Sequence, residues 1–367
     1  MRIHDVAIAG AGPAGSSLAT LLARSGYDVL LLDQSTFPRD KVCGDMLSPR
    51  AFALLCALGC GGEIEALGPK PLRTVEVVLD GTILSATELP DVDGVPGVCR
   101  AIPRRQLDEI VFRGACASGA SALQGCRVRG FRTTESAVAI DADVAGESRA
   151  IAARILVGAD GAQSIVARAA GLAVKDPRYT VSAMRGYATG LDLERATFFF
   201  STDSFPGYAW VFPMSDGELN YGAGLIAEAA SREKLRVRDF LVEVRSMIER
   251  RAHAVGAEVS IHPPVGWPIH TFRPEGPRIF ERGLLIGEAG GFVDPINGEG
   301  ISLAIETAAL AAETIEDVLR SGDVSVRGLE GYERAWRASF EADLRVADLL
   351  VSLIRNRHLR DLWLSWF

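Results

Sequence analysis

The sequence predicts an α/β fold, in which a Rossmann-like, doubly wound domain carries an inserted antiparallel sheet and is followed by a helical C-terminus. Three observations predict this architecture. Short apolar runs followed by glycine-rich turns lie near both ends of the chain, as expected for buried parallel strands of βαβ units. Polar and apolar residues alternate in the middle of the chain, as in antiparallel strands with one face in water. From residue 301 onward the pattern is mostly helical.

The composition is that of a globular protein and argues against several classes of function. The chain has 367 residues, enough for one large or two ordinary domains, and 48% of them are hydrophobic. A net charge of −8 disfavours nucleic acid as a partner, because a polyanion binds to basic surfaces. None of the six cysteines lies in a C-x-x-C pair or a cluster with metal-ligand spacing, so we expect no metal site. With no signal-peptide pattern and no apolar run of about 18 residues, we expect a cytoplasmic protein, a prediction that leaves peripheral membrane contact open.

The first βαβ unit opens the chain. Residues 6–9 form a short apolar run typical of a strand buried on both faces. Residues 16–24 have helical periodicity, and Gly26 ends that helix. A second buried strand covers residues 29–32 and ends at Asp33.

A glycine-rich turn joins the first strand to its helix, and its spacing predicts dinucleotide binding. Gly10 permits the tight turn, Gly12 lets the backbone approach a pyrophosphate, and Gly15 lets strand and helix pack closely. Free N–H groups at the helix start attract phosphate, and an acid about 20 residues further on is placed to bond a ribose hydroxyl. The predicted binding residues of this unit are Gly10, Gly12, Pro13, Ala14, Gly15, Asp33 and Gln34.

The later elements follow the same reasoning. Polar/apolar alternation predicts antiparallel strands over 72–84 and 185–226. Helical periodicity predicts helices at 104–117, 239–251 and 301–319, and through most of 329–367. Short apolar runs predict buried strands at 155–158 and 284–287. We therefore assign residues 1–70, 98–172 and 276–325 to a discontinuous dinucleotide-binding domain, 71–97 and 173–275 to a substrate domain, and 326–367 to C-terminal helices.

Three later segments identify the dinucleotide as FAD through a family resemblance. Residues 158–164, with Arg168 after them, resemble the Asp-Gly motif of FAD enzymes shaped like aromatic hydroxylases, and more narrowly of their geranylgeranyl reductase branch. Residues 285–295 resemble the second FAD motif, although Glu288 stands where the family normally has aspartate. Residues 295–300 resemble the loop beside the isoalloxazine ring, and the dipole of the helix that follows is suited to charge on a reduced flavin. The resemblance implies FAD contacts at Arg104, Asp160, Gly161, Gly287, Glu288, Pro295, Gly298, Gly300 and Ile301.

An aromatic strand provides the candidate substrate wall. Tyr208-x-Trp210-x-Phe212-Pro213, followed by Gly222-x-Gly224, resembles the cavity motif of geranylgeranyl reductases. Alternate residues of a strand share one face of the sheet, so these rings are suited to a long apolar substrate. The alternative is an ordinary packed aromatic core. The candidate substrate residues are Tyr208, Trp210, Phe212 and Gly222.

The segment from Arg39 to Asp45 supplies the candidate catalytic residue. It resembles the cysteine-glycine segment that lies beside the flavin in the reductases, which implies flavin contacts for Arg39, Cys43 and Gly44. A thiol in that position can supply a proton, so Cys43 is the candidate catalytic residue. The alternative is a small buried residue that happens to be cysteine.

These features favour reduction of a carbon–carbon double bond in an isoprenoid or other hydrophobic substrate, with a hydride from reduced flavin and a proton from Cys43 or bound water. The runner-up is a monooxygenase or oxidase that uses O₂ on an aromatic or natural-product intermediate. Halogenation is disfavoured, because the Trp-x-Trp-x-Ile-Pro run of flavin-dependent halogenases is altered at Tyr208 and Phe212, and because Lys70 lies between two prolines. A flavin-carrying electron-transfer protein is a third class that nothing in the sequence favours.

Two partners remain to be named. The chain has no second GxGxxG, so the flavin is expected to receive electrons from docked NAD(P)H or from a reduced redox protein. Residues 359–367 contain Trp363, Trp366 and Phe367 close to several arginines. This amphipathic pattern is compatible with a membrane surface and also with packing against the body or a second subunit.

Overall fold

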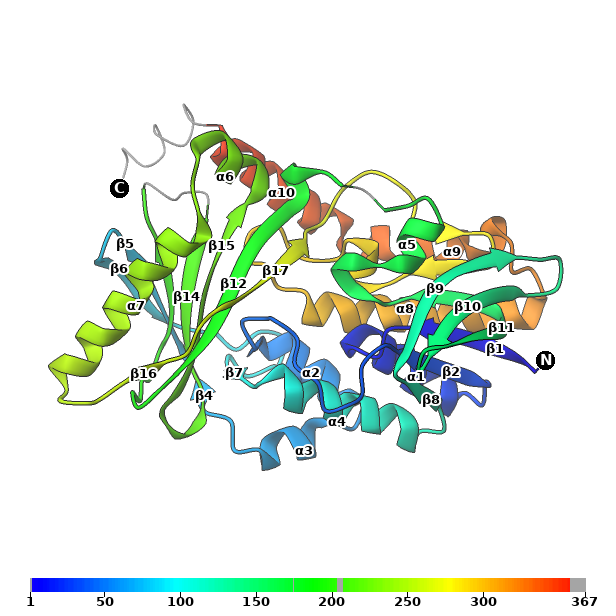
Figure 1. Cartoon of the computed structure of the whole chain (residues 1–367), viewed down its shortest axis with the longest axis horizontal. Helices are drawn as coiled ribbons and strands as arrows, with labels where there is room; N and C mark the ends of the chain where they lie inside the picture. The colour runs from blue at the N-terminus through cyan, green and yellow to red at the C-terminus, as the bar shows by residue number, and fades with distance from the viewer. Residues whose placement is uncertain (1, 174, 203–206, 357–367) are drawn as a thin grey trace.

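The computed structural model of the chain describes residues 2–173, 175–202 and 207–356. Two eight-stranded sheets lie at opposite ends of the molecule, and a small three-stranded sheet lies near their boundary (Figure 1). In the part of the chain that the structure describes, no helix combines the length and the apolar character needed to cross a bilayer.

The first sheet is the Rossmann-like layer. Its strand order is β18-β19-β11-β1-β2-β8, and β10 and β9 pair onto β11 away from this path. The strands β19, β11, β1, β2 and β8 are parallel neighbours, and their carboxyl ends meet at one edge of the sheet. The bounds are β1 Ile3–Ala9, β2 Val29–Asp33, β8 Ser121–Gln124, β9 Cys126–Thr133, β10 Val138–Val144, β11 Glu147–Gly158, β18 Ile279–Phe280 and β19 Gly283–Leu285.

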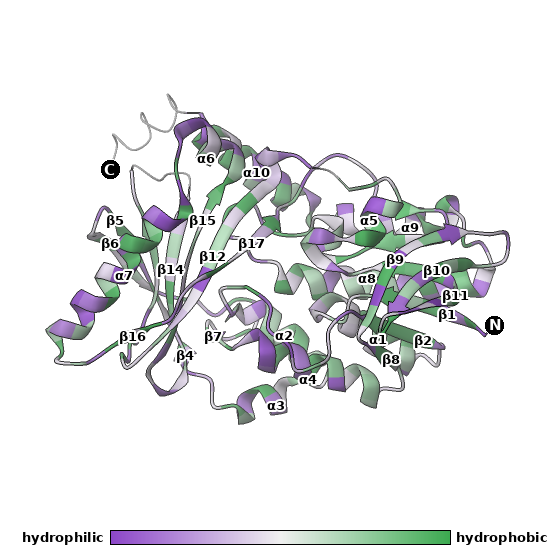
Figure 2. Ribbon diagram, viewed as in Figure 1, coloured by the Kyte–Doolittle hydropathy of each residue, from purple (hydrophilic) through white to green (hydrophobic). Residues whose placement is uncertain are grey.

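Four helices complete the core of this layer. Buried side chains of α1 (Pro13–Arg24), α4 (Arg104–Ala117), α8 (Ile301–Ser321) and α9 (Val326–Trp336) form one cluster with β1, β2 and β11. The cluster continues into a π-helical turn, Arg337–Glu341, and the start of α10 (Ala342–Arg355). The C-terminal helices therefore pack into the same core as the first βαβ unit. In Figure 2 the strands and helices around α1 and β2 are largely in the apolar colour.

The second sheet is mainly antiparallel, in the order β16-β12-β15-β14-β13-β5-β6, with β17 also paired to β12. Its strands are β5 Thr74–Leu79, β6 Thr82–Glu88, β12 Thr180–Thr189, β13 Ala196–Phe200, β14 Tyr208–Pro213, β15 Glu218–Ile226, β16 Ser260–Ile261 and β17 Val265–His270. Helix α7 (Val237–Ala254) covers one face, with its apolar stripe on the sheet and polar residues outside (Figure 2). The remaining elements are α2 Pro49–Ala57, α3 Gly61–Ala66, α5 Ile165–Ala169, α6 Ala227–Glu233, and the small sheet of β3 Met46–Leu47, β4 Pro71–Leu72 and β7 Cys99–Ala101.

The predicted elements are confirmed in type, and the differences lie at their ends. Helix α4 has the predicted bounds, whereas α1 begins three residues early, because proline is favourable in the first turn of a helix. The predicted strand at 155–158 is the end of the longer β11. Strands β9 and β10 were not predicted. Strand β10 pairs with β11 and β9 pairs with β10, and this pairing depends on contacts between segments and not on local pattern. The predicted helix over 357–367 lies outside the described residues.

Candidate active site

The turn between β1 and α1 is packed so closely that two of its glycines have no room for a side chain. A Cβ atom on Gly10 would lie 2.3 Å from the carbonyl oxygen of Ala159, and one on Gly15 would lie 1.9 Å from the carbonyl oxygen of Gly10. A Cβ atom on Gly12 would meet only the Nη2 atom of Arg39, at 3.6 Å. The middle glycine therefore faces open space beside a guanidinium group.

Helix α1 presents an uncapped N-terminus at this turn. Gly12 is its N-cap, Pro13 is its first residue, no side chain caps it and no acidic residue lies in its first turn. The free N–H groups at such an end carry partial positive charge and are suited to bind phosphate. The predicted Pro13, Ala14 and Gly15 are themselves buried, so they can offer a ligand their backbone rather than their side chains.

Asp33, at the end of β2, holds the turn from the neighbouring strand. Its carboxylate accepts hydrogen bonds from the backbone N–H groups of Ala11 and Ser35, both at 2.8 Å. The ribose contact expected of Asp33 stays a prediction, and the remaining lone pairs of the carboxylate leave room for it. Gln34 is exposed beside it.

A buried carboxylate organises the basic residues next to the turn. Asp108, which is 0% exposed, accepts hydrogen bonds from Nε and Nη2 of Arg104 at 2.6 and 2.8 Å and from Nη1 of Arg39 at 2.7 Å. Burial by itself would lower the pKa of Arg104, but Asp108 and the side chain of Cys43, to which the guanidinium donates a hydrogen bond, raise it above its ordinary value. Asp108 thus holds Arg39 near Gly12 and Arg104 near the thiol of Cys43. Asp108 was not among the site residues predicted from the sequence.

Asp160 and Gly161 lie in the turn after β11. The carboxylate of Asp160 accepts hydrogen bonds from the hydroxyl of Ser164 at 2.5 Å and from the backbone N–H of Ile165 at 2.7 Å, and so caps helix α5. Burial raises the pKa of Asp160. Its observed contacts are those of a capping residue, and its predicted contact with the cofactor stays a prediction.

Glu288 meets this turn from a distant part of the chain. Its Oε2 atom lies 3.7 Å from where a Cβ atom on Gly161 would stand and 3.5 Å from Nζ of Lys41. Its Oε1 atom accepts a hydrogen bond from the backbone N–H of His270 at 3.2 Å. The neighbouring Gly287 has a φ of +54°, and a Cβ atom there would lie 3.0 Å from the Cβ atom of Ala14. The second motif therefore packs directly onto α1, although about three-quarters of the chain separates the two segments.

The loop of residues 294–300 is tied to the second sheet. Tyr208 on β14 donates its hydroxyl hydrogen to the carbonyl oxygen of Asn297. Gly298 has a φ of +70°, and a Cβ atom on it would lie 3.0 Å from the Tyr208 hydroxyl oxygen. Tyr208 thus reaches from the substrate sheet to the loop predicted to lie beside the flavin. Pro295, Gly298 and Gly300 are all partly or fully exposed there.

Glu299 alters the expectation for the start of α8. Its carboxylate accepts hydrogen bonds from the N–H and hydroxyl groups of Ser302, so a negative charge already sits at this helix N-terminus. The helix dipole that was expected to face the flavin is partly offset by this charge. Ile301 is 7% exposed, and its side chain packs with α2 and α4.

The aromatic strand packs against the cysteine-glycine segment. A Cβ atom on Gly44 would lie 3.2 Å from the ring of Phe212 and 3.4 Å from the indole nitrogen of Trp210. A Cβ atom on Gly222 would lie 2.2 Å from the Trp210 ring, so only glycine leaves room for the indole there. Trp210 and Phe212 are 6% and 5% exposed, whereas Tyr208 is half-buried. The two inner rings therefore form a packed wall behind Gly44, and contact of these residues with substrate stays a prediction.

A family model described as an FAD binding domain matches residues 4–345. This chain belongs to that family. It is 32% identical over 346 residues to a menaquinone reductase of Mycolicibacterium smegmatis, covering 90% of this chain and 79% of the relative. It is 31% identical over 368 residues to a digeranylgeranylglycerophospholipid reductase of Methanothrix thermoacetophila, covering 96% of this chain and 88% of the relative. A geranylgeranyl bacteriochlorophyll reductase-like structure from Thermoplasma acidophilum superposes with a TM-score of 0.84 at 21% identity, over 97% of this chain and 88% of that one. The chain is therefore an FAD-dependent oxidoreductase of the geranylgeranyl reductase family.

The geometry of this flavoprotein fits FAD. A pyrophosphate needs close backbone approach and N–H donors, and the open side of Gly12 and the uncapped start of α1 provide both. The charged guanidinium of Arg39 stands at the same place. The Cys43–Gly44 segment and the 294–300 loop both contact the aromatic strand that carries Tyr208, so three regions of the chain meet there. These parts were predicted to surround the flavin ring.

Lys70, the residue weighed for halogenase chemistry, is engaged elsewhere in the flavoprotein. Its Nζ atom donates hydrogen bonds to Asp192 at 2.6 Å and to Glu194 at 2.8 Å. These partners raise its pKa, although burial acts in the opposite direction. A lysine held between two carboxylates is poorly suited to capture a hypohalous acid, which supports the prediction against halogenation.

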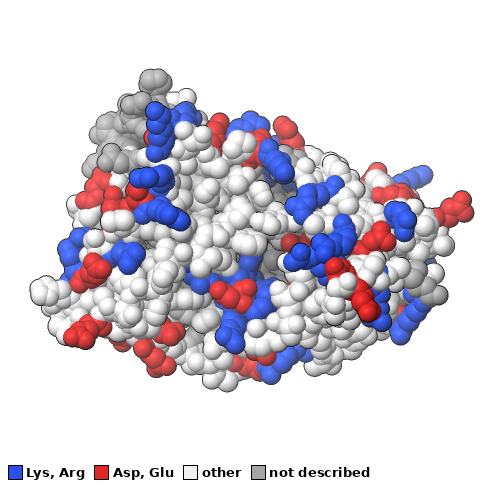
Figure 3. Space-filling view, in the orientation of Figure 1, with Lys and Arg blue, Asp and Glu red and all other residues white. Residues whose placement is uncertain are grey.

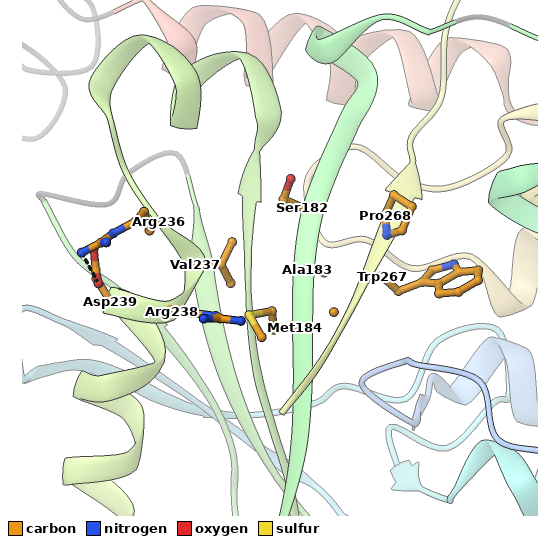
Figure 4. Close-up of a pocket in the computed structure, with 10 residues that line it drawn as sticks. Ser182, Ala183, Met184, Arg236, Val237, Arg238, Asp239, Trp267 and Pro268 are labelled. Carbon is orange, nitrogen blue, oxygen red and sulfur yellow. Dashed lines mark hydrogen bonds and ion pairs between the residues drawn. The ribbon is translucent and has the colours of Figure 1, made fainter. Parts of the chain in front are cut away.

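A separate pocket of about 640 Å³ lies on the face of the second sheet that α7 covers, opposite to the face that carries Trp210 and Asn220 (Figure 4). It is lined by Ser182, Met184 and Pro268 of the sheet and by residues 236–239 at the start of α7. Figure 4 shows the indole of Trp267 pointing away from it, toward the side where Nζ of Lys41 lies 5.5 Å from the ring centre. Because alternate residues face opposite sides of a strand, this pocket does not open onto Cys43.

Proposed function

We propose that this flavoprotein reduces a carbon–carbon double bond in an isoprenoid or other hydrophobic substrate. The observation that carries the proposal is the contact of the cysteine-glycine segment with the aromatic strand: Gly44 packs on Phe212 and Trp210, which places Cys43 at the edge of an apolar wall. The similarity to relatives named for menaquinone and for digeranylgeranyl lipids supports it, because both molecules carry isoprenoid chains. Bound and reduced, FAD supplies a hydride.

The chain's own residues supply the rest of the chemistry. Cys43 holds the proton that the second carbon of the double bond receives. Arg104, which donates a hydrogen bond to the Cys43 side chain, stabilises the thiolate that remains after this proton leaves. Asp108 keeps that guanidinium in place with two hydrogen bonds, and the aromatic wall keeps water from the apolar part of the substrate. We propose NAD(P)H or a reduced redox protein as the electron donor.

An oxygen-free turnover experiment tests the function. The enzyme is reduced with NADPH, NADH or dithionite and mixed with geranylgeranyl lipids or menaquinone. We expect a product that has gained two hydrogen atoms in its isoprenoid chain, detected by mass spectrometry. Cys43→Ala should lower kcat by about 10²-fold, the usual contribution of a positioned proton donor, whereas Cys116→Ala on α4 serves as the matched control. Flavin reoxidation that requires O₂ and yields an oxygenated product would instead establish the monooxygenase alternative.

We also propose that the enzyme contacts an anionic lipid surface. Helix α10 exposes Val346, Leu349, Leu350 and Leu353, at 43–58%, in the i, i+3, i+4, i+7 spacing of one helix face. Four exposed basic residues, Arg232, Lys234, Arg236 and Arg238, lie at the end of α6 and the start of α7, where blue side chains gather in Figure 3. Nη2 of Arg232 donates to the backbone carbonyl of Arg355, so α6 and α10 adjoin. An apolar stripe next to basic charge, in a chain of net charge −8, complements an anionic bilayer.

Vesicle flotation tests this surface. The full chain should float with vesicles that contain anionic lipid and lose that binding in a Leu349→Glu, Leu350→Glu variant. Val242→Glu, a residue 62% exposed on α7, is the control and should float like the wild type. Equal flotation of the double leucine variant and of Val242→Glu would refute lipid contact through α10. Concentration-dependent dimerisation abolished by the leucine variant, without flotation, would show that a second copy covers the stripe. Removing residues 355–367 tests the sequence-based prediction for the tail.

A further inference from the structure

Asp45 is the most deeply placed residue of the cysteine-glycine segment. It is 0% exposed, and its φ of +60° lies in the left-handed region, which a residue with a side chain adopts only at a cost. Its backbone carbonyl accepts a hydrogen bond from the N–H of Ile102 at 2.9 Å. The segment is thus anchored by its backbone on one side, while the Asp45 side chain turns to the second sheet.

Two side chains of the second sheet hold the Asp45 carboxyl group. The hydroxyl of Tyr187 on β12 donates a hydrogen bond to Oδ2 at 2.6 Å, and the amide nitrogen of Asn220 on β15 donates one to the same oxygen at 2.9 Å. The Asn220 nitrogen also donates to the carbonyl oxygen of Cys43 at 3.0 Å. Asp45 and Cys43 are therefore bound by one amide group.

The sheet fixes the orientation of that amide. Tyr187 and Asn220 stand opposite each other in the antiparallel pairing of β12 and β15, so they share one face. The Asn220 oxygen accepts a hydrogen bond from the indole nitrogen of Trp210 at 2.8 Å. With both ends of the amide engaged, Asn220 has one stable orientation. The aromatic wall, the amide and the cysteine segment form one connected unit.

The arrangement is costly for stability, which points to function. Oδ1 of Asp45 is buried without a hydrogen-bond partner. A leucine or asparagine would avoid a buried ionisable group, and a glycine would avoid the left-handed strain. By contrast, both oxygens of the other fully buried carboxylate, Asp108, are paired with arginines. Strain and an unpaired buried polar atom together in one residue next to the candidate catalytic cysteine indicate a positional role.

We infer that Asp45 is a positioning residue for Cys43. With Tyr187 and Asn220 it clamps the Cys43–Gly44 segment to the substrate sheet, so that the thiol keeps a constant position at the aromatic wall. The catalytic importance of this thiol position rests on the proposed function, but the clamp itself is measured without turnover. The charged and titratable groups that act on Asp45 are Tyr187 and Arg185 of β12 and Arg104 of α4. Arg185 also bonds Asp40, and Arg104 also interacts with Cys43, both of the same segment.

The test compares two tyrosines of the same sheet, the partly buried Tyr187 and the fully buried Tyr221. Tyr187→Phe removes only the hydroxyl that donates to Asp45. Tyr221→Phe removes a hydroxyl that donates to the carbonyl of His262 at 2.7 Å, away from the segment, and is the matched control. In the FAD-loaded protein, the rate of Cys43 alkylation by iodoacetamide is followed by peptide mass spectrometry. We expect Tyr187→Phe to raise this rate about tenfold, the ratio that corresponds to the loss of one hydrogen bond, and Tyr221→Phe to leave it unchanged.

Substitutions of Asp45 itself extend the test. Asp45→Asn tolerates the left-handed backbone and retains an acceptor for Tyr187, so it should keep Cys43 protected, whereas Asp45→Ala should expose it. In turnover, Tyr187→Phe should lower kcat about tenfold with little change in KM, because substrate binding does not use the hydroxyl. Equal alkylation rates in Tyr187→Phe, Asp45→Ala and the control would overturn the inference. Exposed Cys43 in these variants, together with no double-bond reduction by the wild type, would uphold the clamp and refute the proposed function.

Discussion

Asp108 and Asp45 are both fully buried carboxyl groups, but the groups that donate hydrogen bonds to them differ in charge. Asp108 accepts three N–H hydrogen bonds from two arginines. Asp45 receives hydrogen bonds from a hydroxyl and an amide, and burial raises its pKa from 3.8 to about 6 despite those contacts. At the scale of single residues, the site thus holds one carboxylate bound by two arginines and one carboxyl group whose pKa is raised to about 6.

This difference predicts how stability depends on pH. In the unfolded chain Asp45 ionises near pH 4, but in the folded protein it ionises only near pH 6, so folding opposes ionisation throughout that window. The contribution of Asp45 to stability is therefore fully present below pH 4, is lost as the pH rises to 6, and does not change further above it. A difference of about two pKa units corresponds to about 3 kcal/mol.

The measurement is urea unfolding of the wild type and Asp45→Asn at several pH values from 4 to 7.5. Asparagine cannot ionise, so the variant should gain about 3 kcal/mol relative to the wild type between pH 4 and pH 7.5. Any packing loss caused by asparagine is the same at each pH and cancels in this comparison. A difference that stays constant over the whole range would contradict the raised pKa.

At the scale of elements, the turn between β1 and α1 separates two uses of glycine. Gly15 is required by packing, because a Cβ atom would collide with the backbone of Gly10 at 1.9 Å. Gly12 is free of such contacts and is required by the ligand, if the pyrophosphate approaches as the spacing predicts. The same motif therefore contains one position that the fold requires and one that is predicted to serve the cofactor.

Alanine variants distinguish the two uses. Gly15→Ala should destabilise the protein by about 3 kcal/mol or more, because neither backbone segment can move aside. Gly12→Ala should keep the stability of the apoprotein within about 1 kcal/mol and weaken FAD binding about tenfold or more. Thermal unfolding of apoprotein and fluorescence titration with FAD provide the readouts. A loss of apoprotein stability in Gly12→Ala equal to that in Gly15→Ala would show that this reading of the turn is wrong.

At the scale of the whole molecule, the chain crosses between the two sheets several times. The first sheet takes strands from residues 3–33, 121–158 and 279–285, and the second from 74–88 and 180–270. Helix α8 packs directly on α1, and β19 pairs with β11. The core of the first layer is therefore incomplete until the last third of the chain has folded.

Truncation tests this dependence. A chain that ends at residue 275 keeps the glycine turn and all of the second sheet but lacks β19, α8 and α9. We expect it to show no cooperative thermal transition and to bind no FAD, because the apolar faces of α1 and β1 lose their partners. Circular dichroism and the yellow absorbance of bound flavin are the measurements. A truncated protein that unfolds cooperatively and binds FAD would demonstrate an independent N-terminal unit.

Features carried by contiguous residues could be predicted from the sequence alone. The glycine turn, the two further FAD motifs, the bounds of α4 and the α/β class all rest on local spacing, which specifies its own geometry. These segments also contain the motifs of the family, so FAD and the oxidoreductase class follow from them.

Tertiary structure alone decided how the side chains meet. The bond from Tyr187 to Asp45 spans 142 residues, that from Asn220 to Asp45 spans 175, and that from Arg39 to Asp108 spans 69. Each depends on strand register and helix placement, because a shift of one residue in a strand turns every side chain to the other face. Local pattern does not specify such a register between distant segments, so the clamp on Cys43 and the binding of two arginines to the buried Asp108 became visible only in the folded chain.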